Sequence, residues 1–262
     1  SPWGLGYPGW HIECSCISMK HLGEYLDIHC GGIDNAFPHH TNEIAQSEAY
    51  LGHDWCNYWF HVHHLNTNDG KMSKSKGEFL TVSLLEEKGY DPLVYRFFCL
   101  QSHYRKSLVF SWDNLDNAAA AYEKLTAKIA AVLDGSGESD AEKCAALRKG
   151  FIDAMDSDLN TALAVTALYD VLKADISNKD KLDLIADFDR VLSLGLIEAA
   201  KKYAAKNAAA DDIPEEIKAL AEQRKAARKE KNFALADELR NKITALGYTI
   251  TETREGTKIT KA

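Results

Sequence analysis

Residues 25–43, YLDIHCGGIDNAFPHHTNE, run from an apolar strand through a turn with two adjacent glycines into a helix. Tyr25–His29 has the short, apolar character of a strand. Pro38 suits a first helical turn, because its backbone angle is already helical. Trp59–Leu65, rich in aromatic residues, is expected to form a second strand. Strand, helix and strand in this order are typical of an α/β nucleotide-binding domain, whose ligands bind where the strands end.

A candidate metal site begins in this stretch. His39 and Glu43 are four residues apart, so their side chains share one face of the predicted helix, and Cys14 lies on an earlier predicted helix, Trp10–Leu22. Zinc accepts a thiolate, an imidazole and a carboxylate, and three protein ligands leave one position open, as a catalytic site requires. The alternative is that no metal binds here, and that the two histidines lie at a helix start beside a solvated glutamate. Other residues could be ligands instead: Cys16, Cys30, His11, His29 and His40. His40 could also hold a ligand in place without binding the metal itself.

A lysine-containing loop is the second candidate site. Lys71-Met72-Ser73-Lys74-Ser75 places two lysines three residues apart, between glycines at positions 70 and 77. Such a loop could fold over phosphates and place two ammonium groups on developing negative charge. A solvated basic loop is the alternative.

The turn after the first strand is a third candidate. Gly31 and Gly32 could let a nucleotide approach the backbone, and Asp34 could bind a ribose hydroxyl. A tight turn whose acid caps the next helix would explain the same residues. Trp10 could line a small pocket beside Cys14, or be an ordinary core aromatic residue.

Beyond residue 84 the pattern predicts helices only, because apolar residues recur at every third or fourth position. Asp113–Leu133 is the longest expected helix, and short loops join it to its successors, as in a helical bundle. Ala199–Asp212 is interpreted as a linker or a weakly packed helix end. Two helices and a hairpin, ending with Thr257–Lys261, are expected to form a compact terminal unit.

The predicted fold class is therefore the α/β half of a Rossmann-like catalytic domain, followed by an α-helical bundle and a small α+β C-terminal module. Helices are expected to predominate. The expected domains are residues 1–84, 85–200 and 213–262.

The charge is unevenly distributed. The chain has a net charge of −8, yet residues 218–242 carry eight Lys or Arg and four Asp or Glu. A basic helix face here could bind phosphates, and Phe233 or Tyr248 could stack on an unpaired base. A solvated helix face is the alternative. The basic residues of this face are Lys218, Arg224, Lys225, Arg228, Lys229 and Lys231.

Composition narrows the class of protein. With 262 residues and 45% hydrophobic content, the chain can form one large core or several small ones. Six scattered cysteines favour free thiols or metal ligands over disulfides. No apolar run approaches the roughly 18 to 20 residues of a membrane span, so we expect a cytoplasmic protein without a membrane partner. Because the chain starts at Ser1 without a leader, we expect it to be the later part of a longer protein.

Four motifs occur in a fixed order and together resemble one family. They are residues 8–15 (PGWHIECS), 27–34 (DIHCGGID), 37–43 (FPHHTNE) and 71–75 (KMSKS). The chain is similar to the second half of a cysteinyl-tRNA synthetase, a class I aminoacyl-tRNA synthetase, and the likeness continues to the end of the chain.

The resemblance implies ATP-dependent ligation of cysteine to tRNA(Cys) through a cysteinyl-adenylate, by a parent enzyme that is a monomer. It implies one Zn2+ per active site of the parent enzyme, with Cys14, His39 and Glu43 as three of its four ligands, and that the metal takes the thiolate of the substrate. Serine has no thiolate to offer, so cysteine would be selected without editing. Trp10 would form a wall of the amino-acid pocket.

The resemblance also implies how ATP, with Mg2+, is bound. Asp34, Gly31 and Gly32 would bind the adenosine part of ATP. Lys74 would steady the pyrophosphate leaving group, with Lys71 assisting. The helical bundle would support the inner bend of the tRNA, and the terminal module would read the anticodon.

Three departures from the family pattern affect these expectations. The fourth zinc ligand and the His-Ile-Gly-His motif of the family belong to an N-terminal half that the chain is expected to lack, so the isolated chain is predicted to be inactive. Cys30 and Glu78 stand where many members carry Gly and Asn, which we expect to be tolerated. Ile259 stands where an aromatic residue is common, which argues against base stacking there.

Two other functions are compatible with parts of the pattern. One is a cysteine ligase that joins cysteine to an amino-sugar, although such paralogues lack an anticodon module. The other is a tRNA-binding or zinc-binding module without catalytic activity.

Overall fold

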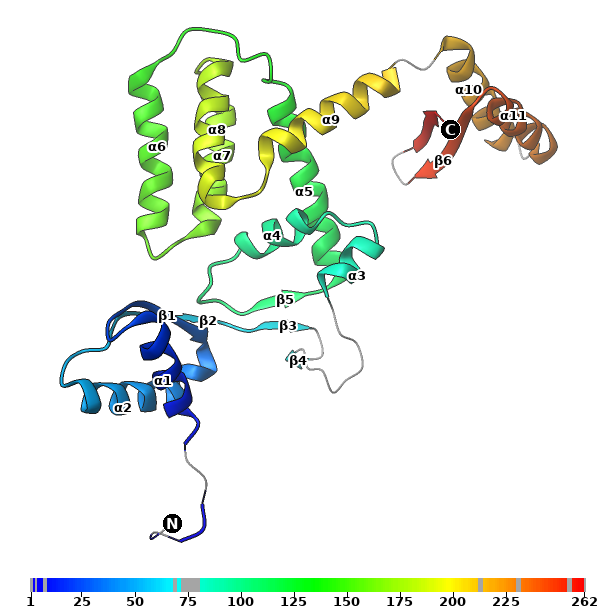
Figure 1. Ribbon diagram of the computed structural model, residues 1–262. Coiled ribbons are helices and arrows are strands. Elements are labelled where there is room, and N and C mark those ends of the chain that lie inside the picture. The colour runs from blue at the N-terminus through cyan, green and yellow to red at the C-terminus, as the bar shows by residue number, and fades with distance from the viewer. Residues whose placement is uncertain are drawn as a thin grey trace.

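The computed structural model describes residues 2, 4–6, 9–67, 70–71, 81–211, 214–229, 232–253 and 256–261. Helices predominate, and the described strands form three small sheets (Figure 1). The predicted fold class is confirmed.

The first part of the chain contains a parallel strand pair and two helices. Its elements in chain order are α1 (His11–Leu22), β1 (Leu26–Gly32), a 3-10 turn (Ile33–Asn35), a wider turn (Ala36–His40), α2 (Thr41–Leu51) and β2 (Cys56–Val62). In the β1–β2 register Leu26 pairs with Cys56 and Gly32 with Val62. On one face of the pair, Ile28 and Tyr58 are 62% and 70% exposed. Parallel sheets are usually covered on both faces, whereas this face of the β1–β2 pair is exposed.

The helix predicted to start at Pro38 starts later. Residues 36–40 form a wide turn in which Phe37 has an extended backbone, and α2 itself begins at Thr41. His39 nevertheless reaches Glu43, with Nε2 3.1 Å from Oε1, so the predicted shared face is present.

Two strand predictions were wrong. The predicted strand Trp59–Leu65 is two elements, β2 and β3 (Leu65–Thr67), and β3 belongs to a different sheet. That sheet has the order β4–β3–β5, with β4 at Gly70–Lys71 and β5 at Leu108–Phe110. A strand therefore lies within residues 85–200, where only helices were predicted. Three residues are too few to show a periodicity, and the parallel pairing with β3 exists only in the folded chain.

A helical bundle follows. Its helices are α3 (Val82–Glu87), α4 (Pro92–Leu100), α5 (Trp112–Ala130), α6 (Ala141–Asp156), α7 (Thr161–Lys173), α8 (Asn178–Leu192) and α9 (Leu196–Asp211). Each of α3 to α8 begins after a Thr, Asp, Ser or Asn whose side chain accepts a backbone N–H of the first turn. Their shared core includes the fully buried Phe97, Leu125, Leu168 and Phe188. None of the described helices is long and apolar enough to cross a membrane.

The segment interpreted as a linker is part of a helix. The described helix α9 continues to Asp211 and extends away from the bundle (Figure 1). The segment is rich in alanine, lysine and asparagine and has few large apolar residues to bury, which suggested a linker. Alanine and lysine nevertheless have high helix propensity, so the segment is helical. The linker alternative was wrong.

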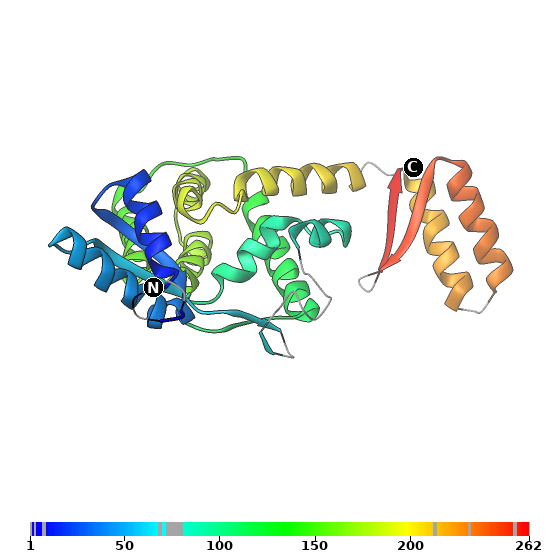
Figure 2. The ribbon, with the colours of Figure 1, turned by 60° about the horizontal axis from the view of Figure 1, so that its bottom comes forward.

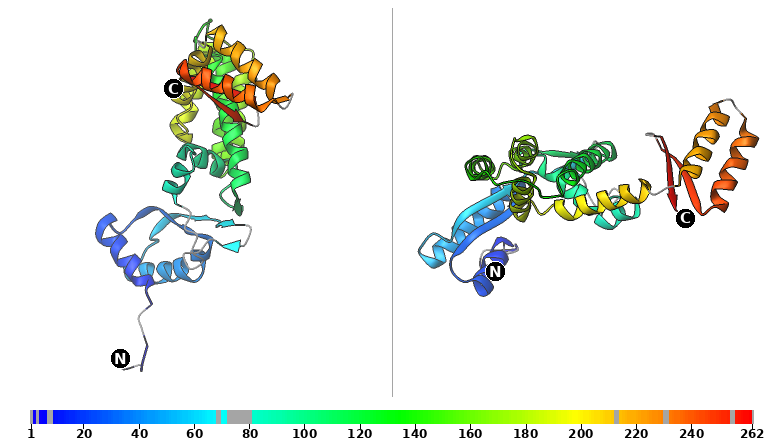
Figure 3. Two further views of the ribbon diagram at one scale, coloured as in Figure 1. Left: turned by 90° about the vertical axis from the view of Figure 1, so that its right-hand side faces the viewer. Right: turned by 90° about the horizontal axis from the view of Figure 1, so that it is seen from above.

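The terminal module has its own core. It contains α10 (Glu215–Lys229), α11 (Phe233–Ala245) and an antiparallel hairpin of β6 (Tyr248–Thr253) and β7 (Gly256–Lys261), at the far end of α9 (Figure 2). Figure 3 shows the two helices side by side with the hairpin against them. The core residues include Ile217, Leu220, Ile243 and Ile250, separate from those of the bundle. The predicted hairpin is confirmed; the domain boundaries stay a prediction.

One hydrogen bond across the bundle core is testable. Tyr122 of α5 donates to the Leu194 carbonyl at 2.7 Å, between α8 and α9. Tyr122→Phe leaves that buried carbonyl unpaired, so we expect the free energy of unfolding to fall by roughly 1 to 3 kcal/mol. Tyr169→Phe is the matched control, because no hydrogen bond is described for that hydroxyl; we expect a change below about 0.5 kcal/mol. Urea unfolding measures both, and equal effects would contradict the role of the Tyr122 hydroxyl.

Candidate functional site

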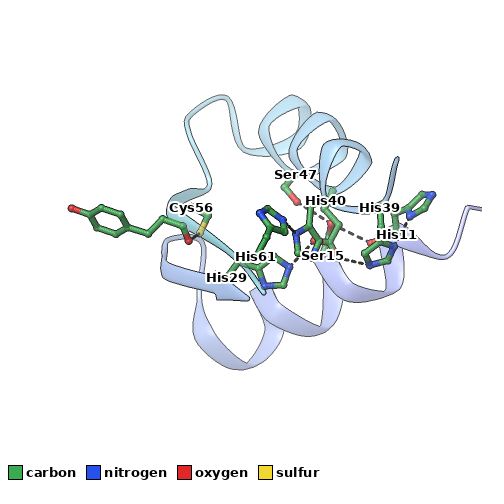
Figure 4. Close-up of polar contacts among 10 residues, drawn as sticks. His11, Ser15, His29, His39, His40, Ser47, Cys56 and His61 are labelled. Carbon is green, nitrogen blue, oxygen red and sulfur yellow. Dashed lines mark hydrogen bonds and ion pairs between the residues drawn. The ribbon is translucent and has the colours of Figure 1, made fainter. Parts of the chain in front are cut away.

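The site is built where α1 and α2 pack side by side (Figure 4). Two short, buried side chains meet at the contact: Ser47 of α2 donates to Ser15 Oγ of α1 at 2.9 Å. Ser15 in turn donates to the carbonyl of His11. Because serine is small, the helices approach closely, and this brings Cys14 of α1 to Glu43 of α2.

Glu43 lies at the centre of the site. Its side chain is completely buried, and Oε2 accepts a hydrogen bond from His29 Nε2 at 2.6 Å. Oε1 lies 3.1 Å from His39 Nε2 but has no hydrogen bond of acceptable geometry. Within the described residues, these two histidines are the ion-pair partners of the carboxylate. A buried carboxylate needs compensation, so its unpaired oxygen indicates a position for a cation.

Cys14, His39 and Glu43 come together as the sequence predicted. Their ligand atoms all lie within 4.8 Å of one another. Burial, and next the carboxylate of Glu43, raise the pKa of the Cys14 thiol. A cation between the three groups would remove this penalty, since a coordinating thiol is deprotonated. Sulfur, nitrogen and oxygen donors with one unpaired buried oxygen fit a zinc ion.

His11 is a neighbour of the site rather than a member of either described ligand group. Its Nδ1 shares a 2.7 Å hydrogen bond with Nδ1 of His39, which leaves His39 Nε2 turned toward Glu43. This second contact orients a metal-binding imidazole. The ring of Trp10, 53% exposed, lies 4.7 Å from the His11 ring and is stacked 6.3 Å from the His39 ring. Trp10 is therefore beside the site, and its place in an amino-acid pocket stays a prediction.

Two rival cysteines lie elsewhere. Cys16 and Cys30 are exposed, and neither belongs to a described group of ligands. Cys16 is two residues from Cys14 on α1, which turns it to another side of the helix.

A second group of ligand atoms shares Glu43. It contains His29, His40 and Glu43, again within 4.8 Å of one another. Nδ1 of the buried His40 is 2.9 Å from His61 Nε2. Burial, and next the neighbouring His29, lower the pKa of His40 to about 4. Sequence reasoning missed His61, whose only signal was its place in an aromatic-rich strand.

The glycine turn packs tightly on this group. A Cβ at Gly31 would lie 2.7 Å from His40 Cε1, and one at Gly32 would lie 2.5 Å from Asp34 Oδ1. A side chain at Gly31 would clash with the buried ring of His40, whereas the exposed carboxylate of Asp34 could move away from a side chain at Gly32. Asp34, about half exposed, has its Oδ1 3.5 Å from His64 Nε2. The roles of these three residues in binding ATP stay a prediction.

The lysine loop is described only at its start. Lys71 is in the two-residue strand β4, paired with Asn66. Lys74 lies outside the described residues, as does Glu78, so the proposed roles of the loop stay predictions.

The terminal module contains a cavity of about 520 Å3 lined by arginines and an aromatic residue. Arg228, Arg240 and Phe233 are among its lining residues, together with Asp237. Arg224 also lines it but is buried, so the solvated alternative is wrong for this residue, while its binding of phosphate stays a prediction. Ile259 is partly buried against the core of the module.

Two families match parts of the chain. The first, described as "tRNA synthetases class I (C) catalytic domain", matches residues 1–120. The second, described as "Cysteinyl-tRNA ligase anticodon binding domain", matches residues 210–258. The matched ranges include the ligand groups around Glu43 and the arginine-lined cavity, respectively.

Individual relatives match almost the whole chain. Over 99% of the chain's own length, it is 45% identical to the cysteine–tRNA ligase of Caldicellulosiruptor saccharolyticus. Over 94% of the chain, it is 42% identical to the cysteine–tRNA ligase of Treponema denticola. The ligase of Geobacter sulfurreducens is 43% identical over 98% of the chain. The chain spans about half the length of these relatives, covering 58%, 55% and 58% of them.

Glu43→Gln tests the central carboxylate. The amide keeps the volume but loses the charge, so we expect zinc affinity to fall by about 100-fold or more. This is more than the loss usually seen when a residue that only hydrogen-bonds to a metal ligand is removed. Glu13→Gln on α1 is the matched control, because Glu13 is exposed and outside both ligand groups. Equilibrium dialysis with zinc measures both. Unchanged affinity in Glu43→Gln would contradict a metal site at this carboxylate.

Cys14→Ser tests the sulfur ligand. With Co2+ in place of zinc, we expect the near-ultraviolet thiolate-to-cobalt charge-transfer band of the wild type to disappear in Cys14→Ser and to persist in Cys16→Ser. The reason is that serine offers no thiolate, whereas Cys16 is outside the group. A band that survives in Cys14→Ser would assign the sulfur ligand to another cysteine.

Proposed function

The chain belongs to the cysteinyl-tRNA synthetase family, and from that premise we propose that the protein that carries it ligates cysteine to tRNA(Cys) at the expense of ATP. The observation that carries the proposal is the convergence of Cys14, His39 and the unpaired oxygen of Glu43 around one buried carboxylate. A thiolate, an imidazole and a carboxylate are donors for a metal that can in turn bind the thiol of a substrate.

Selection of cysteine would rest on this donor set. A zinc ion held there supplies a Lewis-acid position that binds a thiolate in preference to a hydroxyl. His29 and His11 keep Glu43 and His39 in the orientation that such binding needs. Trp10, whose exposed ring stacks 6.3 Å from that of His39, would contact the remaining atoms of the amino acid. Because serine lacks a thiolate, no editing step is required.

Binding of ATP would involve the end of β1. Gly31 and Gly32 close that strand, and the carboxyl ends of parallel strands are where nucleotides bind in such sheets. Asp34 is exposed beside them and suits a ribose hydroxyl. Lys74, with Lys71, would balance the charge of pyrophosphate as it leaves. The carboxylate of cysteine would attack the α-phosphorus, forming the adenylate.

Recognition of RNA would involve the cavity of the terminal module. Phe233, 61% exposed at the start of α11, can stack on an unpaired base, and Arg228 and Arg240 can bind phosphate or a base edge. The match of residues 210–258 supports this assignment and counts against an amino-sugar ligase, which would lack such a module.

By itself the 262-residue chain is expected to show no cysteine-dependent exchange of ATP and pyrophosphate. The described metal group has three protein ligands, and the β1–β2 pair is open on the face of Ile28 and Tyr58. The exchange assay measures this, with the Caldicellulosiruptor saccharolyticus ligase run in parallel as the positive control. Cysteine-dependent exchange that is abolished by Lys74→Ala would overturn the expectation of inactivity.

Phe233→Ala and Arg228→Ala test the RNA site. Each is expected to raise the Kd for tRNA(Cys) by about 10-fold, the loss of one stacked base or one charged contact. Arg190→Ala, an exposed arginine of α8 in the bundle, is the matched control. Filter binding at fixed salt measures all three, and a tRNA(Cys) with a substituted anticodon should bind the wild type as weakly as the variants. Affinities equal to that of Arg190→Ala would rule out the cavity as the anticodon site.

A further inference from the structure

The first part of the chain, from α1 to β2, meets the helical bundle through a narrow contact (Figure 1; Figure 3, left). Among the described residues, the bundle core and its half-buried border include Leu65 and Leu108 but no residue of β1 or β2. A cavity of about 310 Å3 lies at this contact, lined by residues of β2, α4 and the turn between α6 and α7, among them Phe60 and Leu159. A contact of this kind, without a shared core, permits the two parts to move relative to each other.

The loop between α4 and β5, residues 101–107, bridges the contact. The backbone N–H of His63, just after β2, donates to the Tyr104 carbonyl at 2.9 Å. The ring of Tyr104 stacks on the ring of Phe60 in β2, with centroids 4.2 Å apart. The position of the end of β2 relative to the bundle therefore depends on where this loop is held.

One carboxylate holds the loop. Asp158, in the turn between α6 and α7, accepts hydrogen bonds from the Tyr104 hydroxyl and from Nε of Arg105. Nη2 of Arg105 donates to Oδ1 of the same carboxylate at 3.3 Å, and Nε2 of His103 lies 3.8 Å from Oδ2. The Arg105 guanidinium also lies over the Tyr104 ring, 5.1 Å from its centroid. Three successive side chains of the loop thus converge on Asp158.

The turn that contains Asp158 has an unusual backbone. Asp158 and Leu159 have φ angles of 58° and 53°, a left-handed conformation that aspartate tolerates better than leucine. Backbone hydrogen bonds from Leu159 to Met155 and from Asn160 to Ala154 hold the turn in this conformation. Strain of this kind persists where the surrounding structure fixes it, and it is common at functional sites.

We propose that Asp158 is a latch, whose contacts with Tyr104 and Arg105 keep the first part of the chain fixed to the bundle. When these contacts open, the β1–β2 pair can turn as a rigid unit about the β2–β3 connection, because a cavity rather than a shared core lies between the two parts. Arg105 is 62% and Asp158 47% exposed, so salt can screen their attraction and favour the open state. The latch is a property of the fold and does not require the proposed ligase activity.

Hydrogen exchange of the purified 262-residue chain, followed for single amides by NMR, tests the latch. Asp158→Gly removes the carboxylate but keeps the turn, because glycine readily adopts a positive φ. The His63 and Leu108 amides donate across the contact, to Tyr104 and to His64. We expect both to exchange about 10-fold faster or more, the effect of losing one charge-assisted hydrogen bond. Amides within the β1–β2 ladder and in the core of α5 should keep their rates.

Ser193→Gly is the matched control. Ser193 also has a positive φ, 52°, but it ends α8, and its side chain takes part in none of the described hydrogen bonds. We expect no change at His63 in this variant. Raising NaCl from about 0.01 to about 1 M should accelerate exchange at His63 in the wild type and in Ser193→Gly, but not in Asp158→Gly, where no ion pair remains to be screened.

Tyr104→Phe tests the same contact from the other side. It should accelerate exchange at His63 in the wild type and add nothing in Asp158→Gly, since both changes remove one interaction. Far-ultraviolet circular dichroism checks that each variant is folded. If Asp158→Gly is not folded, Tyr104→Phe alone decides, because it keeps both the ring and the turn.

Four results would each overturn the latch. The first is unchanged exchange at His63 in Asp158→Gly or in Tyr104→Phe. The second is equal acceleration in Ser193→Gly, and the third is additive effects of Tyr104→Phe and Asp158→Gly. The fourth is equal acceleration within the β1–β2 ladder or the α5 core, which would show local or global unfolding in place of a rigid turn.

Discussion

A buried carboxylate without a lysine or arginine partner in the described structure governs the first part of the chain. Glu43 has no exposed surface, and its neighbours are histidines and a cysteine. Burial of such a charge is costly unless hydrogen bonds and cations offset it. The close contact of α1 and α2, the histidine of β1 and the wide turn before α2 all bring donors to this one group. A metal ion is the compensation that the donor types favour, and the proposed binding of a thiol rests on it.

The two functional ends of the chain are supported by different cores. The ligands around Glu43 depend on the α1–α2 contact and on a strand pair that is open on one face. The bundle core and the terminal core are separate clusters, joined through α9. Substitutions around Glu43 and in the terminal module should therefore change stability independently, since residues that share no partners usually contribute additively.

Much of the site could be predicted, because its signal is local. His39 and Glu43 share a face through their spacing, and Cys14 joined them because its helix was visible as a pattern. The misses involve pairing between distant segments. The strand β5 has three residues and exists through its partner β3, the start of α2 was shifted by the turn at residues 36–40, and the burial of Arg224 depends on the packing of α11. None of these features repeats along the chain, so periodicity could not reveal them.

By itself, the sequence determined the helices, the glycine turn, the donor types and the likeness to one family, because spacing and residue chemistry act over a few neighbouring positions. Only the tertiary structure decided which donors meet. Rival ligands such as Cys16 and Cys30 have the right chemistry but lie outside both groups, whereas His29 and His40 converge on the same carboxylate as His39. A ligand site depends on distances of a few ångströms between elements far apart in the chain, and packing of α1, α2, β1 and β2 sets those distances.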